Sequence, residues 1–186
     1  DLRAMSLTLY QNEKQVGRWP VAVGKGETPT PIGVYRINHR FTTEPSGFGT
    51  RFLGLNVPWG QYGIHGTNRP GSIGSRASHG CIRMFTKDAE TLYRLVPNWT
   101  RVVIEDGPYS GFGSGMQKLL PSARGSQVVE AQKRLRALGY YDGGLDGIYG
   151  RGMSAALKQF KADKGLPWVD CVDQATWDAL GAILFE

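Results

Sequence analysis

The 186-residue sequence is poor in reactive side chains, since it holds only 2 cysteines and 3 histidines. Two cysteines exclude a disulfide-dense scaffold and a four-cysteine zinc site, so any sulfur chemistry uses one thiol or a single bridge. No stretch approaches the ~18 consecutive apolar residues of a membrane-spanning helix. Charges among the first residues also interrupt any signal-peptide core. We therefore expect no membrane span in this chain and few residues that carry chemistry.

Glycine is abundant, with 26 residues, but no G-x-y period accompanies it, and 40% hydrophobic residues are enough for a packed core. Collagen and wholesale disorder are therefore excluded. The formal charge of +6 is uneven, because residues 1–106 hold 13 Lys and Arg against 8 Asp and Glu. Ten of these 13 cations are Arg, which suits a substrate with carboxylate or phosphate groups. A solvated basic surface is the other interpretation. No basic helix or dense Lys/Arg run favours nucleic acid.

Composition divides the chain into two domains and a linker. Segment 107–125 has five Gly and two Pro without a sustained period, which predicts a linker. Before it, a domain over residues 1–106 is predicted to be β-rich, with one helix that has Thr86 as N-cap. The strands are expected in residues 6–10, 15–24, 33–39, 51–57 and 100–105.

Behind the linker, the hydrophobic period becomes helical and predicts three helices in residues 126–186. The first has Ser126 as N-cap, the second covers residues 153–164, and the third has Asp173 as N-cap. A unit of this size is small but able to fold alone. The fold class expected for the whole chain is α+β, with a β-rich domain followed by a small all-α domain.

Two of the three histidines and one cysteine lie within 17 residues, from His65 to Cys81, in a stretch rich in Gly and Ser. An imidazole within hydrogen-bond reach and nearby Arg charges would lower the pKa of a thiol and favour the nucleophilic thiolate. Backbone N–H groups around Gly80 and Cys81 would face the oxyanion of a tetrahedral intermediate. This cluster is the expected site.

Three other interpretations of the cluster remain open. A lone cysteine is commonly an inert, small apolar residue. His65, His79 and Cys81 are also chemically suited to a three-ligand zinc site with an open position. A disulfide between Cys81 and Cys171 would silence the thiol, although nothing in the spacing favours it.

Two motifs in this stretch resemble the signature of the L,D-transpeptidase (YkuD) catalytic domain. They are His-Gly-Thr at residues 65–67 and Ser-His-Gly-Cys-Ile-Arg at residues 78–83. Segments 21–25 and 28–33 resemble the strand and turn that precede the active site in that family, so the resemblance covers about residues 5–105. It implies a β-sandwich-like catalytic domain that needs no cofactor and no metal.

The resemblance also implies a mechanism. Cys81 would attack the carbonyl after the third residue of a peptidoglycan stem tetrapeptide, expel the terminal D-Ala and hold the peptide as a thioester. An amine of a neighbouring stem would then resolve the thioester into a 3→3 cross-link. His65 corresponds to the family's base, with its ring oriented by the Gly66 backbone carbonyl. Sequence adjacency alone favours His79, which would otherwise shape the loop with Gly80 or polarise the substrate.

Substrate contacts are expected from residues around these motifs. Arg83 stands where many family members have Asn, and its guanidinium, with that of Arg76, is suited to a stem-peptide carboxylate. For Arg76, a solvated side chain is the equal alternative. Trp59 and Tyr62 would line a substrate groove, although core packing would also explain them. The full set of expected substrate-binding residues is Arg83, Ser78, Thr67, Trp59, Tyr62 and Arg76.

Residues 126–181 resemble the three-helix peptidoglycan-binding domain that is often attached to wall hydrolases. The resemblance includes Gln132, the segment Leu-Asp-Gly-Ile-Tyr-Gly at residues 145–150, and Trp177. Cys171 stands where Gly often follows Asp, so we expect it to be structural or incidental. A helical spacer without a ligand is the alternative.

Together these features predict an exported, monomeric enzyme of the bacterial wall, vegetative or spore, whose partner is peptidoglycan and not nucleic acid. Stem peptides would bind the first domain and glycan the second, which would raise the effective concentration of the enzyme at its polymer. Two alternatives stay open. An L,D-carboxypeptidase would give the same thioester to water, and a catalytically silent protein would only bind the wall.

Overall fold

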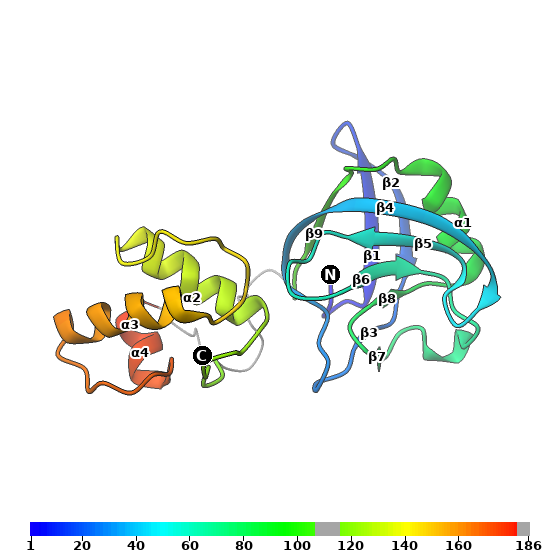
Figure 1. Cartoon of the computed structure of the whole chain (residues 1–186). Helices are drawn as coiled ribbons and strands as arrows, with labels where there is room; N and C mark the ends of the chain where they lie inside the picture. Colours follow the sequence, from blue (N-terminus) through cyan, green and yellow to red (C-terminus); the bar gives the residue numbers. More distant parts are fainter. Residues whose placement is uncertain (107–115, 182–186) are drawn as a thin grey trace. The chain divides into compact units, whose positions relative to one another are not determined.

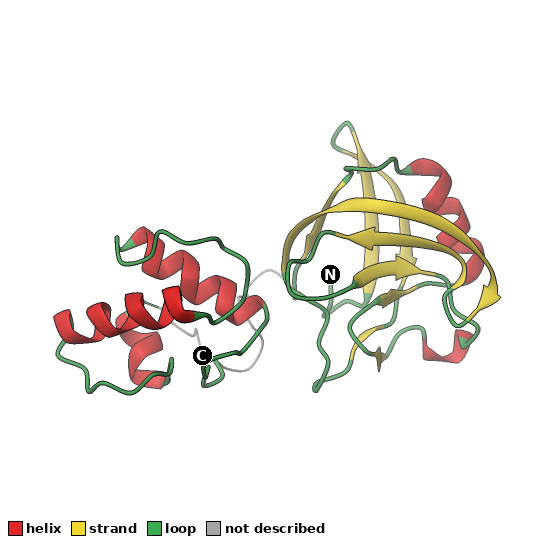
Figure 2. Cartoon of the chain, in the orientation of Figure 1, coloured by secondary structure: helices red, strands yellow, loops and turns green. Residues whose placement is uncertain are grey.

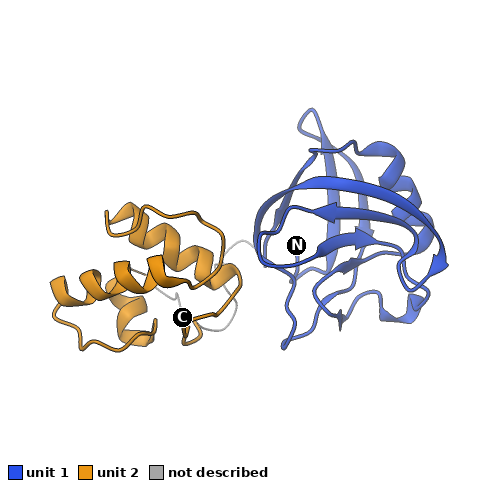
Figure 3. Ribbon diagram, in the orientation of Figure 1, with its two compact units in different colours: residues 1–111 blue, residues 112–186 orange. Residues whose placement is uncertain are grey.

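The computed structural model describes residues 1–106 and 116–181, and the chain divides into two compact units, residues 1–111 and 112–186 (Figure 3). The first half of the segment predicted as a linker lies outside the described residues. Its second half joins the helical unit, because Leu119 and Val172 exchange two backbone hydrogen bonds of 2.9 Å. Leu119 is also buried in the core of that unit.

Unit 1 is built from strands, with one α-helix and one short 3-10 helix among its described residues (Figures 1 and 2). A five-stranded sheet has the order β8-β6-β5-β4-β9, while β1 pairs with β2 and β3 pairs with β7. The elements of this unit are β1 Ser6–Gln11, β2 Lys14–Pro20, β3 Val23–Gly24, β4 Gly33–Ser46, β5 Gly49–Leu55, β6 Tyr62–His65, η1 Pro70–Ser72, β7 Arg76–Ser78, β8 Ile82–Arg83, α1 Thr86–Leu95 and β9 Arg101–Ile104.

The core of unit 1 lies between the large sheet, the β1–β2 hairpin and α1. Leu7 and Leu9 of β1 pack against a cluster that includes Ile37 of β4 and Ile64 of β6. Helix α1 buries Ala89 and Leu92 and contacts β5. The β-sandwich-like domain expected from the sequence is therefore confirmed.

Unit 2 has three described helices, α2 Ser126–Ala137, α3 Arg151–Asp163 and α4 Gln174–Ala179. Their apolar faces meet in one core around Leu135, Phe160 and Trp177, each fully buried. This confirms the predicted all-α domain. Among the described residues, no helix has both the length and the apolar character needed to cross a bilayer.

Several boundaries differ from the sequence prediction for identifiable reasons. Thr86 is the first residue of α1 rather than its N-cap, because its hydroxyl donates to the Thr67 carbonyl. Ser126 is likewise inside α2, and Gly125 is the N-cap. Asp173 does cap α4, accepting the Thr176 N–H.

The strand prediction was correct for the long apolar runs and missed three short strands, β6, β7 and β8. These strands of two to four residues lie in the Gly- and Ser-rich stretch, where period-2 alternation has no length to develop. Strand β4 also runs on to Ser46, and Gly49 begins β5 at a φ of +66° after a tight turn.

Candidate functional site

Parallel pairing of β6 and β8 brings the two motifs together. Ile64 pairs with Ile82 and His65 with Arg83, although 18 residues separate each pair. His65 ends β6, and Cys81 immediately precedes β8. The loop between these strands therefore returns the thiol to the edge where the imidazole lies.

His65 and Cys81 line one cavity of about 500 Å³. Its lining also contains Arg69 and Arg83 but no Asp or Glu, so the site is positively charged. The other residues that line it are Gly47, Phe48, Gln61, Thr67, Asn68, Ser78 and His79. An anionic group, such as a carboxylate, suits this cavity.

His65 is 3% exposed, and its Nδ1 lies 2.5 Å from the Gly66 carbonyl oxygen. Because a carbonyl only accepts, Nδ1 carries the proton and Nε2 keeps a free lone pair. Burial lowers the pKa of His65 from the ordinary 6.5 to about 4, the Gly66 hydrogen bond opposes this shift, and the Arg83 charge adds to it. The ring is therefore a neutral imidazole at neutral pH, able to accept a proton.

Burial raises the pKa of the Cys81 thiol, while a hydrogen bond from the Gly63 backbone and the Arg83 charge lower it less strongly. The expectation of a lowered thiol pKa is therefore wrong for the free site, because loss of hydration outweighs the cationic neighbour. The resting pair is a thiol and a neutral imidazole rather than an ion pair. Such a thiol needs a base at the moment of attack.

Ser78 closes the turn that carries the cysteine. Its hydroxyl donates to the Cys81 carbonyl oxygen at 2.5 Å and accepts the Gly80 N–H at 3.0 Å. The Gly80 N–H is thus occupied, contrary to the expected role in an oxyanion hole. Gly80 itself has a φ of +113°, and a Cβ there would lie 2.6 Å from the Tyr62 ring. Only glycine fits this position.

The two arginines expected to bind substrate lie in different places. Arg83 lines the cavity, and its buried Nε has no hydrogen-bond partner among the residues that the structure describes. Arg76 does not line the cavity, and its guanidinium lies 3.3 Å from Asp106. The structure therefore offers Arg83, and not Arg76, to an anion in the cavity.

Trp59 and Tyr62 also lie outside the lining of this cavity. Both are half-buried and pack against the core of unit 1. A hydrogen bond from the Trp59 side chain lowers the pKa of Tyr62, but burial raises it more. The Tyr62 ring lies against Gly80, and the Trp59 ring contacts Tyr35 edge to face.

Of the other predicted residues, Thr67, Ser78 and His79 line the cavity, whereas Gly66 and Gly80 do not. Thr67 is buried and accepts the Arg69 N–H through its hydroxyl, whereas His79 is exposed. Sequence reasoning missed Phe48, which reaches the cavity from the turn between β4 and β5. Only strand pairing brings it there, so no local motif could have indicated it.

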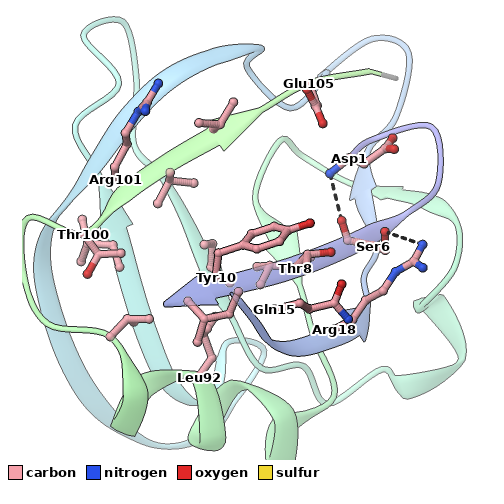
Figure 4. Close-up of a pocket in the computed structure, with 17 residues that line it drawn as sticks. Asp1, Ser6, Thr8, Tyr10, Gln15, Arg18, Leu92, Thr100, Arg101 and Glu105 are labelled. Carbon is pink, nitrogen blue, oxygen red and sulfur yellow. Dashed lines mark hydrogen bonds between the residues drawn. The ribbon is translucent and has the colours of Figure 1, made fainter. Parts of the chain in front are cut away.

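A second cavity of about 550 Å³ lies between β1, α1 and β9 (Figure 4). None of the predicted site residues lines it. Its lining mixes Leu92 and other core residues with polar side chains such as Thr8 and Gln15. The cavity lined by His65 and Cys81, although slightly smaller than this one, is therefore the candidate active site.

Two of the open alternatives can be compared with the structure. Cys81 and Cys171 are both free thiols in this structure. Across residues 1–106 and 116–181, no group of three or more His, Cys, Asp or Glu side chains is arranged to hold a metal ion.

Comparison with known proteins identifies the class. The model of the family described as "L,D-transpeptidase catalytic domain" matches residues 1–104, more than half of the chain, and the chain belongs to this family. The model described as "Putative peptidoglycan binding domain" matches residues 124–180. The recognition of both domains from their motifs is therefore confirmed.

Among the relatives is a Bacillus subtilis protein named "Putative L,D-transpeptidase YkuD", 46% identical over 101 residues, which are 54% of this chain and 60% of the relative. The chain thus spans about three fifths of that relative's length. The B. subtilis "Spore cortex-lytic enzyme" is 44% identical over 54 residues, which are 29% of this chain and 18% of that protein.

A solved structure, the Ldtfm–avibactam carbamoyl enzyme, superposes with a TM-score of 0.50 at 22% identity. The match covers 57% of this chain and 47% of that chain. At this identity the likeness shows the fold alone.

Proposed function

We propose that this chain is a cysteine-dependent L,D-transpeptidase that acts on peptidoglycan stem tetrapeptides and forms 3→3 cross-links through a thioester. The observation that carries the proposal is the shared cavity, which is lined both by Cys81 and by His65, whose Nδ1 donates to the Gly66 carbonyl. A nucleophile, a base and an orienting acceptor are the parts that acyl transfer requires.

In the first half of the reaction, His65 Nε2 takes the proton from Cys81 Sγ as the sulfur attacks the carbonyl carbon of the third stem residue. The carbonyl oxygen becomes an oxyanion, which the Cys81 backbone N–H would stabilise by a hydrogen bond. The bond to the D-Ala nitrogen then breaks, and His65 returns the proton to that nitrogen. The products are free D-Ala and a thioester on Cys81.

In the second half, the side-chain amine of a neighbouring stem attacks the thioester carbon. His65 accepts a proton from this amine, the carbon–sulfur bond breaks, and the proton returns to Cys81 Sγ. A new amide joins two third-position residues. The neutral resting pair suits both halves, because His65 must begin each half unprotonated.

Positive charge supports an anionic stem peptide as the donor. The substrate's carboxylate would receive hydrogen bonds from Arg83, whose Nε is buried without a partner. The Arg83 guanidinium lines the cavity, and a planar guanidinium binds a carboxylate through charge-assisted hydrogen bonds. Arg69, which is exposed at the rim of the cavity, would add attraction.

Unit 2 would hold the enzyme on its polymer, as the match to the peptidoglycan-binding family suggests. An enzyme with this substrate works outside the cytoplasm, in the wall. The name of the spore cortex-lytic relative makes a spore wall one setting to examine.

Product analysis tests this proposal. The protein is incubated with purified disaccharide-tetrapeptide, and the muropeptides are separated and weighed by mass spectrometry. Dimers joined through two third-position residues, with release of D-Ala, are the expected result. Tripeptides without dimers would contradict transfer and identify a carboxypeptidase. Unchanged tetrapeptides would leave a wall-binding protein.

A further inference from the structure

The β-sheet that carries His65 also carries a row of aromatic rings that ends on this histidine. The row follows strand register, since Phe41 of β4 pairs with Phe52 of β5, and Phe52 pairs with His65 of β6. The ring planes of Phe52 and His65 differ by 9°, with centroids 5.7 Å apart. Phe41 and Phe52 stack at 4.9 Å with an angle of 13°. The imidazole is thus the last ring of a stack.

Glycines in the same strands make this stack possible. Gly63 lies two residues before His65 in β6, and a Cβ added there would overlap the Phe52 ring. The Phe52 ring can therefore lean over the backbone of β6 and lie parallel to the imidazole. Glycine inside a strand commonly marks such a close approach.

A second ring holds the imidazole from another direction. Phe48, in the turn between β4 and β5, meets His65 at 4.9 Å with an interplanar angle of 79°. It meets Phe52 edge to face as well, at 5.6 Å and 88°. Phe48 lines the cavity and is 49% exposed. The Phe52 ring therefore covers one face of the imidazole, and the Phe48 ring packs against the imidazole on the side of the cavity.

The same turn also touches the residue that orients the imidazole. Gly49 has a φ of +66°, and a Cβ there would lie 2.7 Å from the Gly66 Cα. The turn thus packs against Gly66, whose carbonyl accepts the Nδ1–H of His65. The end of the β4–β5 hairpin therefore contacts both the His65 ring and Gly66, whose carbonyl accepts the hydrogen bond from that ring.

We propose that Phe52 and Phe48 are positioning residues for His65, which clamp its imidazole on the Gly66 carbonyl, direct Nε2 to Cys81 and keep water from the ring. This inference rests on the proposed role of His65 as the base. Offset-stacked and edge-to-face aromatic pairs contribute stabilisation beyond the area that they bury, and this energy depends on the orientation of the rings. A base held in place needs no reorganisation when the proton transfers.

Water exclusion gives the clamp a measurable consequence, because burial is the main cause of the low pKa of His65. The charged and titratable groups around the imidazole are few. The positive charge of Arg83 on β8 opposes protonation of the imidazole. The other titratable or charged residues that line the same cavity are Cys81, His79 and Arg69. His39 lies at the far end of the stack, against Phe52. Opening the clamp changes none of these groups, so any rise in the pKa of His65 would report hydration.

The test is a histidine titration by NMR on the full chain labelled with ¹³C and ¹⁵N, with the His65 signal assigned from its loss in His65→Gln. Phe48→Ala should raise the pKa of His65 by about one pH unit, because water reaches the ring. Phe52→Leu should raise it less, since leucine keeps apolar cover. Phe48→Tyr should restore the wild-type value. Phe85→Ala, at a residue 40% exposed and outside the stack, is the matched control and should change nothing.

An unchanged His65 pKa in Phe48→Ala would overturn the inference. Phe48 is half-exposed, so this variant keeps the test valid even if Phe52→Leu does not fold. A carbapenem serves as a second probe, because its strained β-lactam carbonyl is open to attack by the Cys81 thiol in place of the stem-peptide carbonyl. Acylation of the protein by this probe, followed against pH, gives the second measurement. Phe48→Ala should slow it about tenfold and move its acidic limb upward with the pKa. No acylation of the wild type, with the titrations as expected, would contradict the proposed function and leave the clamp intact.

Discussion

The two units differ in how completely a few of their buried polar side chains are hydrogen-bonded. In unit 2, Gln132 donates to Asp146 at 2.8 Å and accepts the Gly147 N–H at 3.0 Å, and the Lys161 ammonium donates to the Val169 carbonyl at 2.9 Å. These groups are satisfied by the unit itself. Their role is to fix the loops between the helices.

In unit 1, Ser78 and Thr67 at the cavity are hydrogen-bonded, but two other polar groups there are left partly unsatisfied. His65 uses only Nδ1 in a hydrogen bond, and Arg83 Nε has no partner. Arg40 Nε is also unpaired, but its guanidinium lies 4.2 Å over the Tyr93 ring, outside the site. Unpaired buried groups cost free energy of folding. Among the described residues, the unpaired buried side-chain atoms thus lie in unit 1, one of them on a residue that lines the candidate site, and none lies in unit 2.

The largest expected effect is on the base. His65→Gln should slow acylation by a carbapenem at least about a hundredfold, because the thiol then has no proton acceptor. The rate is measured by mass spectrometry of the intact protein over time. His39→Gln is the control, since His39 is exposed and outside the cavity. A rate close to wild type in His65→Gln would remove the main reason to call the cavity a site.

Next in size is loss of the internal network of unit 2. Gln132→Ala should lower the free energy of unfolding of this unit by about 2–3 kcal/mol, because the Gly147 N–H and the Asp146 carboxylate lose their buried partner. Urea denaturation followed by the NMR signals of residues 126–179 measures it. Gln174→Ala, at an exposed amide, should cost less than about 0.5 kcal/mol. Equal effects would show that the buried network does not stabilise the unit.

Substitution of Arg83, which lines the cavity, should have a smaller effect. Arg83→Gln should slow acylation by the tetrapeptide donor about tenfold, since it removes a charged donor from the carboxylate. Release of D-Ala gives the rate. Arg76→Gln, which alters the pair with Asp106, should leave it unchanged. If the two variants slow the reaction equally, the net positive charge of unit 1 sets the rate, and the position of Arg83 in the cavity does not.

The smallest expected effect is a difference in acid sensitivity. The pKa of His65 falls from 6.5 to about 4 on folding. Below pH 6.5 the unfolded chain therefore binds a proton that the folded chain does not, and the free energy of unfolding decreases as the pH falls toward 4. From pH 7 to 5.5 unit 1 should lose about 1 kcal/mol. Unit 2 has no histidine. Hydrogen bonds from Thr176 lower the pKa of Asp173 below 3.8. The stabilisation of unit 2 by the ionised Asp173 is therefore lost only in stronger acid.

Urea denaturation of the full chain at pH 7 and 5.5, with separate NMR signals for each unit, measures this difference. His65→Gln should remove the loss in unit 1. Equal losses in both units would contradict the assignment of the acid sensitivity to His65.

The sequence predicted what local patterns determine. Long apolar runs gave the major strands, helical spacing gave the three helices of unit 2, and the motif spacing placed His65 and Cys81 in one site. It failed where tertiary contacts decide. Thr86 is not a cap because Thr67 offers its hydroxyl a better partner. Phe48 reaches His65 only through strand register, which leaves no local signal in the sequence.

The central claim is that Cys81 is the nucleophile of an acyl-transfer site. Mass spectrometry of the intact protein after incubation with a carbapenem tests it most directly, with Cys171→Ala as the control for the second thiol. The account predicts one covalent adduct in the wild type and in Cys171→Ala, located on the peptide that contains Cys81, and none in Cys81→Ala. An adduct that persists in Cys81→Ala, or a wild type that gains no mass, would contradict it.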